Sequence, residues 1–156
     1  MRIIVVIFLS IILASCSSTK NQETSKHIDF KSVSKNTNSG FEKLTEQVIQ
    51  NKTDFEKAWA IAWSHFSDPT PLPAINFENE TVVLVALGMR NNGGFQLNIN
   101  TVHELGNELT INYTETTPNP KCSNTQAIVF PYEFISIPKT SKKVTFNSSQ
   151  QVGSCN

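Results

Sequence analysis

The sequence predicts a mainly β (α+β) fold, in which one amphipathic helix packs on an antiparallel sheet or sandwich. Three observations lead to this prediction. Several segments after residue 80 alternate apolar and polar residues with the period of a half-buried strand. A single segment, residues 53–66, carries its apolar residues at helical spacing. Asn, Ser, Gly and Pro separate these segments, as they do between strands of antiparallel sheets.

The strand predictions follow the chain in order. We expect two strands around a turn at residues 36–40, and a central strand at 81–88, which is apolar on both faces. Residues 95–102 and 109–113 alternate around a turn at Gly106–Asn107. A loop over 116–124 precedes a strand at 125–137, which Pro131 must bend or place at an edge because proline lacks an N–H. The short segment 142–146 closes the sheet.

The helix is predicted to begin at Thr53, whose side chain would form a capping box with Glu56. Its apolar stripe consists of Phe55, Trp59, Ala62, Trp63 and Phe66. Two tryptophans at this spacing favour core packing over a platform for stacking a ligand. The proline-rich segment 67–73 then ends the helix.

The first residues resemble a bacterial lipoprotein signal. Arg2 precedes an apolar run at 3–13, which is too short to span a bilayer permanently, and small residues lead to Cys16. We therefore predict a signal peptide at 1–15, a lipid on Cys16 with palmitate-type acyl chains, a flexible tether at 16–27 and a single domain at 28–156. The protein would lie in the bacterial cell envelope, anchored to the outer membrane if Ser17 permits sorting to that membrane. The sequence leaves both the periplasmic and the surface-facing leaflet as alternatives. The alternative is ordinary secretion with a spare cysteine.

Charge and cysteine content narrow the partners. Loss of Arg2 with the signal peptide leaves nearly equal numbers of basic and acidic residues and no basic stripe, so nucleic acid is not expected as a partner. Cys122 and Cys155 remain as an even pair, and in an oxidising compartment they predict a disulfide. Two free thiols or an intermolecular bridge are the alternatives. Neither cysteine has the ligand spacing of a zinc site.

The sequence gives little reason to expect an enzyme. His27, His65 and His103 fall in the tether, the helix end and a strand end, and no zinc-protease, nucleophile-elbow or phosphate-loop motif occurs. We predict no catalytic residues, no metal and no cofactor.

Residues 88–99, GMRNNGGFQLNI, are the most distinctive stretch. Asn92–Gly93 predicts a tight hairpin turn, because both residues tolerate positive φ. A turn alone explains Gly94 less well, and that residue could form a bulge or admit the backbone of a partner. We predict a partner-binding surface at Arg90, Asn91, Asn92, Gly93, Gly94 and Phe95. Phe95 is also a core candidate, so Arg90 and Asn91 are expected to be exposed and replaceable by alanine with little change in melting temperature.

Four features within residues 74–146 are typical of one known family: the apolar strand ending in Leu87–Gly88, the Gly93–Gly94–Phe95 turn, the Thr117–Pro118 loop, and Pro131–Tyr132 before residues 137–139. Through these features the segment resembles the C-terminal domain of the protease complex subunit PrcB family. The resemblance implies a lipoprotein that associates with and stabilises a secreted protease, and it supplies no catalytic residues.

The same loop resembles, more weakly, the loop of chagasin-type peptidase inhibitors through Asn92 and Gly94–Phe95, without that loop's threonines. The sequence therefore predicts a lipid-anchored, non-enzymatic module that binds an envelope or secreted protease. The alternatives are a peptidase inhibitor that uses residues 91–95, and a small-ligand-binding or hydrolytic envelope protein.

Overall fold

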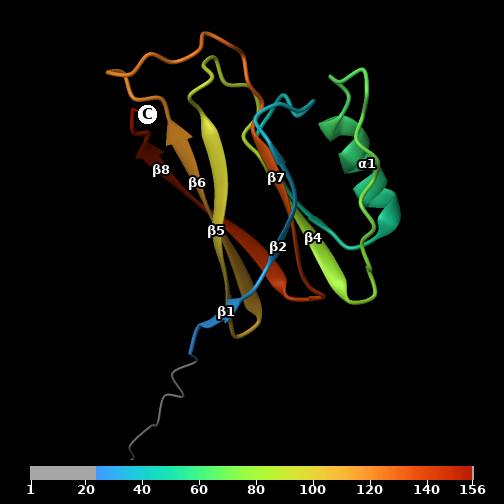
Figure 1. The fold of residues 1–156 in the computed structure, drawn as a ribbon. Helices are drawn as coiled ribbons and strands as arrows, with labels where there is room; N and C mark the ends of the chain where they lie inside the picture. Colours follow the sequence, from blue (N-terminus) through green and yellow to red (C-terminus); the bar gives the residue numbers. More distant parts are fainter. Residues whose placement is uncertain (1–23, 156) are drawn as a thin grey trace, which may run out of the picture.

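A computed structural model of the chain describes residues 24–155 as two four-stranded sheets packed face to face, with one helix on the outer face of the second sheet (Figure 1). The predicted mainly β fold with a single packed helix is confirmed. The predicted signal peptide and Cys16 lie outside the described residues. Within the described part, no helix is long and apolar enough to cross a membrane.

Sheet A contains four strands, in the spatial order β1 (Lys26–Ile28), β5 (Gln96–Leu105), β6 (Glu108–Thr117) and β8 (Lys143–Val152). The predicted turn at Gly106–Asn107 joins β5 to β6, and Gly106 takes a positive φ of 56° there. β8 is longer than the predicted closing strand and runs parallel to β6, so the expectation of a purely antiparallel sheet is wrong at this pair. The chain enters β8 from sheet B at the end where β6 also starts, which fixes the parallel direction.

Sheet B contains the other four strands, in the spatial order β2 (Lys31–Asn36), β7 (Tyr132–Pro138), β4 (Glu80–Ala86) and β3 (Thr45–Ile49). β4 lies in the interior of the sheet, as its two apolar faces predict. β2 and β3, expected on either side of one turn, lie at opposite edges of the sheet. Pro131 neither bends β7 nor places it at an edge, because β7 starts one residue later and lies between β2 and β4.

The core has two layers because sheet B is covered on both faces. Val83 and Val85 of β4 point to sheet A, while Val82 and Leu84 point to the helix. All four side chains are fully buried. The continuous apolar run that sequence analysis assigns to a central strand is therefore required by a three-layer arrangement of sheet, sheet and helix (Figure 1).

The helix α1 (Lys52–Ala62) is capped by Asn51, and the predicted capping box at Thr53 is wrong. The Asn51 side-chain oxygen accepts a hydrogen bond from the Asp54 backbone N–H at 2.9 Å. Asparagine is as strong an N-cap as threonine, so the helix starts before Thr53. Trp59 is buried against sheet B, which confirms its expected core role, and its ring N–H donates to the carbonyl of Thr70.

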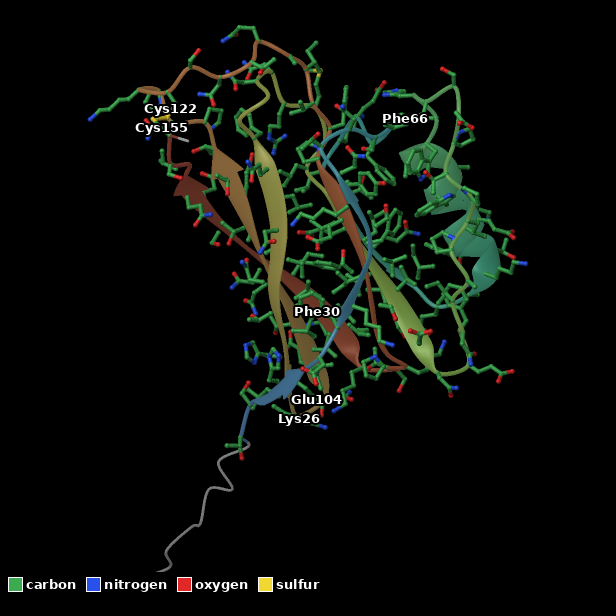
Figure 2. All side chains as sticks on the ribbon, in the orientation of Figure 1. Lys26, Phe30, Phe66, Glu104, Cys122 and Cys155 are labelled. Atoms are coloured by element: carbon green, nitrogen blue, oxygen red, sulfur yellow. A yellow bond between two sulfur atoms is a disulfide. The ribbon has the colours of Figure 1, made fainter. Side chains whose placement is uncertain are left out.

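The domain starts earlier than predicted. Lys26 and His27, which the sequence assigns to the tether, form β1 and pair with Glu104 and His103 of β5. Figure 2 places Lys26 and Glu104 at one end of the fold and the two labelled cysteines at the opposite end. The chain therefore enters the domain at the end that lies farthest from the Cys122–Cys155 disulfide.

Candidate functional site at the loop end

Three connecting segments gather at the end of the fold that carries the disulfide. They are residues 87–95 between β4 and β5, residues 118–131 between β6 and β7, and residues 153–155 after β8. We call this surface the loop end. Figure 1 shows the second of these segments arching over the start of β5 and the end of β8.

Residues 87–95 do not form the predicted hairpin. β4 belongs to sheet B and β5 belongs to sheet A, so the segment carries the chain from one sheet to the other. Among the described residues positive φ occurs at Gly88 and Gly106, not at Gly93 or Gly94. An Asn-Gly pair makes a tight hairpin only when the strands on both sides pair with each other, and here they do not.

The two glycines are needed for close packing within the chain. A Cβ on Gly94 would lie 2.5 Å from the side-chain oxygen of Asn124, and one on Gly93 would lie 3.2 Å from the carbonyl oxygen of Thr125. The Gly93 N–H donates to that same carbonyl at 2.8 Å. The expectation that Gly94 admits the backbone of a partner is therefore wrong: it admits the 118–131 segment of its own chain.

Arg90 is also used inside the protein. Its Nε donates to Oε1 of Glu115 at 2.6 Å, and its Nη1 donates to the carbonyl of Leu87 at 2.8 Å. The Arg90 side chain is 26% exposed and the Glu115 side chain 12%. Arg90→Ala would leave the largely buried Glu115 carboxylate without its cation, which is destabilising. The prediction that Arg90 is exposed and can be replaced by alanine with little change in melting temperature is therefore wrong.

The remaining predicted residues divide between structure and surface. The side-chain oxygen of Asn92 accepts from the Gly94 N–H at 2.8 Å, which shapes the crossover. Asn91 is exposed. Phe95 is half-buried, with the Arg90 guanidinium carbon 5.8 Å from its ring centre, and it stays outside the sandwich core that starts at Leu97.

Two hollows border the crossover at residues 87–95. The larger, about 850 Å³, is polar and is lined by Gln96, Asn119, Lys121, Thr125 and Gln151, among others. The smaller, about 470 Å³, is lined by Asn91, Phe95, Pro118 and Pro120, among others. The smaller hollow thus combines an aromatic face and two proline rings with an exposed amide, which suits a side chain of a protein partner.

The predicted disulfide between Cys122 and Cys155 is present, with a Cα–Cα distance of 5.3 Å. It fixes the tail after β8 to the 118–131 segment. Nearby, the Asn119 side-chain amide donates to the carbonyl of Gly153 at 3.1 Å. These contacts join residues that are far apart in the sequence. Of the two, only the disulfide could be predicted from the sequence, because the two cysteines form an even pair.

Buried polar groups at this end serve the fold. Burial, together with a hydrogen bond to Glu46, raises the pKa of Tyr113 to about 12, so the phenol stays protonated and links β6 to β3. Glu133 is buried, accepts from the Ile99 N–H at 2.9 Å and lies 3.3 Å from the Lys35 ammonium, which joins the two sheets. Neither arrangement places a nucleophile beside a base.

The histidines do not form a common site. His27 and His103 face each other across β1 and β5, with ring centres 5.5 Å apart, whereas His65 packs on Phe130. Over residues 24–155 there is no group of three or more His, Cys, Asp or Glu side chains able to hold a metal ion.

Residues 81–138 match the family model described as PrcB C-terminal. The resemblance predicted for residues 74–146 is thereby confirmed over this shorter range. No curated protein and no solved structure matches the chain. The matched segment runs from β4 to the end of β7 and contains both long connections of the loop end, while β8 and Cys155 lie beyond it.

Proposed function

We propose that this chain is a non-enzymatic accessory subunit that binds a peptidase of the bacterial envelope through the loop end. The main support for the proposal is that the family-matched segment and the loop end occupy the same part of the chain. The segment that matches the PrcB family supplies both long connections that build this surface, 87–95 and 118–131. This overlap supports the proposal that a role in a protease complex, which the family resemblance implies, is carried out by the loop end.

The chemistry of the loop end supports contact with a protein. Met89 and Ile128 are 57% and 61% exposed, and they flank the isolated bridge between Arg90 and Val129. Met89, Ile128 and the smaller hollow provide apolar contact points, and Asn91 and its polar neighbours surround them. This composition is common at protein–protein interfaces. The disulfide and the close-packed glycines hold these groups in place before a partner arrives, which lowers the entropy lost on binding.

The position of β1 supports the orientation of this surface. A lipid on Cys16 would hold the domain through a short segment that joins it at Lys26, at the far end from the loop end (Figure 2). With a dozen residues or fewer, a flexible tether spans roughly 20 Å. The loop end then faces away from the membrane, in reach of an envelope or secreted peptidase.

The first test replaces Asn91 with alanine. The immobilised chain is incubated with solubilised bacterial envelope, and the peptidase activity that stays bound is measured. We expect this bound activity to be about tenfold lower for the variant than for the parent, which corresponds to a loss of about 1.4 kcal/mol in binding free energy. The melting temperature should stay within a degree or two, because the Asn91 side chain is exposed and makes no hydrogen bond within the described residues. Activity is measured as hydrolysis of a generic protein substrate by the eluted complex.

Asn79→Ala is the matched control, since Asn79 is an exposed asparagine that lies before β4 and outside the loop end. It should retain the parental activity. Equal retention by Asn91→Ala and the parent would remove Asn91 from the interface. If the parent retains no peptidase at all, the proposed function itself fails.

The second test concerns the anchor. Cys16→Ser should leave an unprocessed or soluble protein, whereas the parent should partition into the detergent phase, because stable anchoring needs more than one acyl chain. Phase separation with a non-ionic detergent measures the distribution. If the Cys16→Ser variant partitions into the detergent phase as the parent does, the assignment of the lipid to Cys16 is wrong.

A further inference from the structure

β8 is an edge strand with a complete row of free backbone groups. It is paired only with β6 among the described strands. The Lys143 N–H donates to Asn107 and the Gly153 N–H to Thr117, so odd-numbered residues of this strand direct their backbone groups towards β6. The N–H and C=O groups of the even-numbered residues therefore point away from the sheet. These residues are Val144, Phe146, Ser148, Gln150 and Val152.

This edge lacks the features that normally block edge pairing. The register between β6 and β8 runs without a bulge for ten residues, and Lys143 is the single charged residue of β8. β2, at an edge of sheet B, differs in both respects, because it has a bulge between Ser32 and Ser34 and carries two lysines. Long, flat, uncharged edges readily pair with another strand.

An apolar side chain lies beside the same edge. Leu44, just before β3, is 58% exposed and borders a hollow of about 190 Å³ with Tyr113, Ser148 and Gln150. The hollow opens between the edges of the two sheets. A strand added next to β8 would cover both the hollow and Leu44.

We propose that β8 pairs antiparallel with β8 of a second copy of this chain, about a two-fold axis at Ser148. In this register Ser148 meets Ser148 of the second copy, Phe146 meets Gln150, and Val144 meets Val152. All these residues carry outward backbone groups, so the pairing forms on the order of ten hydrogen bonds. Sheet A would continue through the interface as one sheet of two copies.

Charge and position favour a second copy as the occupant. Lys143 falls opposite Gly153, so the register brings no like charges together. Because Leu44 borders Ser148, the two-fold axis brings the two exposed leucines and their hollows close to each other. Of the loop end, Gly153 lies at the end of this pairing, and Leu87 and Arg90 line the hollow that it covers. Residues 91–95 and 118–131 take no part in the pairing and remain free for a partner, so the inference does not depend on the proposed function.

The register is tested by cysteine cross-linking of the full-length chain. Ser148→Cys should give a disulfide-linked dimer on mild oxidation, because Cα atoms of a hydrogen-bonded antiparallel pair lie about 5.5 Å apart. Ser149→Cys is the matched control. The two copies of residue 149 would be offset by about 6.8 Å along the strands, which places their Cα atoms roughly 8 Å apart and too far for a bridge. Equal cross-linking at both positions would overturn the register.

Sedimentation velocity on the purified full-length chain tests the interface itself. Ser148→Pro removes an N–H that sheet A does not use, and Leu44→Lys places two charges beside the axis. Each should raise the dimer dissociation constant about tenfold or more while the circular dichroism spectrum stays unchanged. A parent chain that is monomeric, or a dimer that survives both substitutions, would overturn the proposal, even if β8 were then found to bind a strand of another protein.

Discussion

Replacing both Cys122 and Cys155 with serine should lower the free energy of unfolding by about 3–4 kcal/mol. The bond closes a loop with a sequence separation of 33 residues, so its loss frees the unfolded chain to adopt many more conformations. Urea denaturation of the double variant beside the parent measures the difference. Parental protein kept under a reductant should unfold at the same urea concentration as the double variant.

The same change should weaken binding at the loop end. The disulfide ties the 118–131 segment to the tail, and this segment packs on Gly94 and lines both hollows. We expect peptidase retention to fall at least as far as in Asn91→Ala, measured well below the unfolding transition. An unchanged urea midpoint would show that the bond contributes nothing to stability, and unchanged retention would show that it does not organise the site.

Local patterns predicted the elements of this fold well. Alternation identified β5 and β6, with Leu97, Ile99, Leu109 and Ile111 all buried. The absence of alternation in β4 correctly indicated burial on both faces, because apolar residues on both sides of a strand are stable only between two covering layers. These patterns depend on the residues of one segment, which is why a single sequence suffices to read them.

The partner of each strand could not be read in this way. Asn92–Gly93 and Gly106–Asn107 both look like hairpin turns, yet only the second joins strands of one sheet. The first lies on a crossover because β4 pairs with β3 and β7, a choice made by long-range packing. The parallel pairing of β6 with β8 was missed for the same reason.

Exposure within the candidate site was equally difficult to predict. Arg90 lies in a polar stretch, and nothing near it in sequence indicates the ion pair with Glu115, 25 residues away. Gly94 correctly indicated that another group packs closely on the chain there, but that group is the Asn124 side chain of the same protein and not the backbone of a partner. Residue type therefore identified the important positions, while the structure decided which of them serve folding.

Phe134→Ala should separate folding from binding with the largest loss of stability in this set. Phe134 is fully buried between sheet B and α1, and its ring centre lies 5.7 Å from that of Phe55 and 5.8 Å from that of Trp59. Removing the ring leaves a cavity and breaks these aromatic contacts, for an expected cost of about 3–5 kcal/mol. Chemical denaturation measures this cost.

Phe95→Ala is the matched substitution at the loop end, and the comparison decides whether the site acts through its surface. Phe95 is half-buried, and its ring makes a cation–π contact with the Arg90 guanidinium. Removing the ring should therefore lower the free energy of unfolding by about 1 kcal/mol or less. It should nevertheless reduce peptidase retention, because its ring lines the smaller hollow, whereas Phe134→Ala should retain the peptidase at temperatures where it stays folded. If retention instead follows stability in both variants, the peptidase responds to the folded fraction of the chain and the hollow beside Asn91 is not its contact.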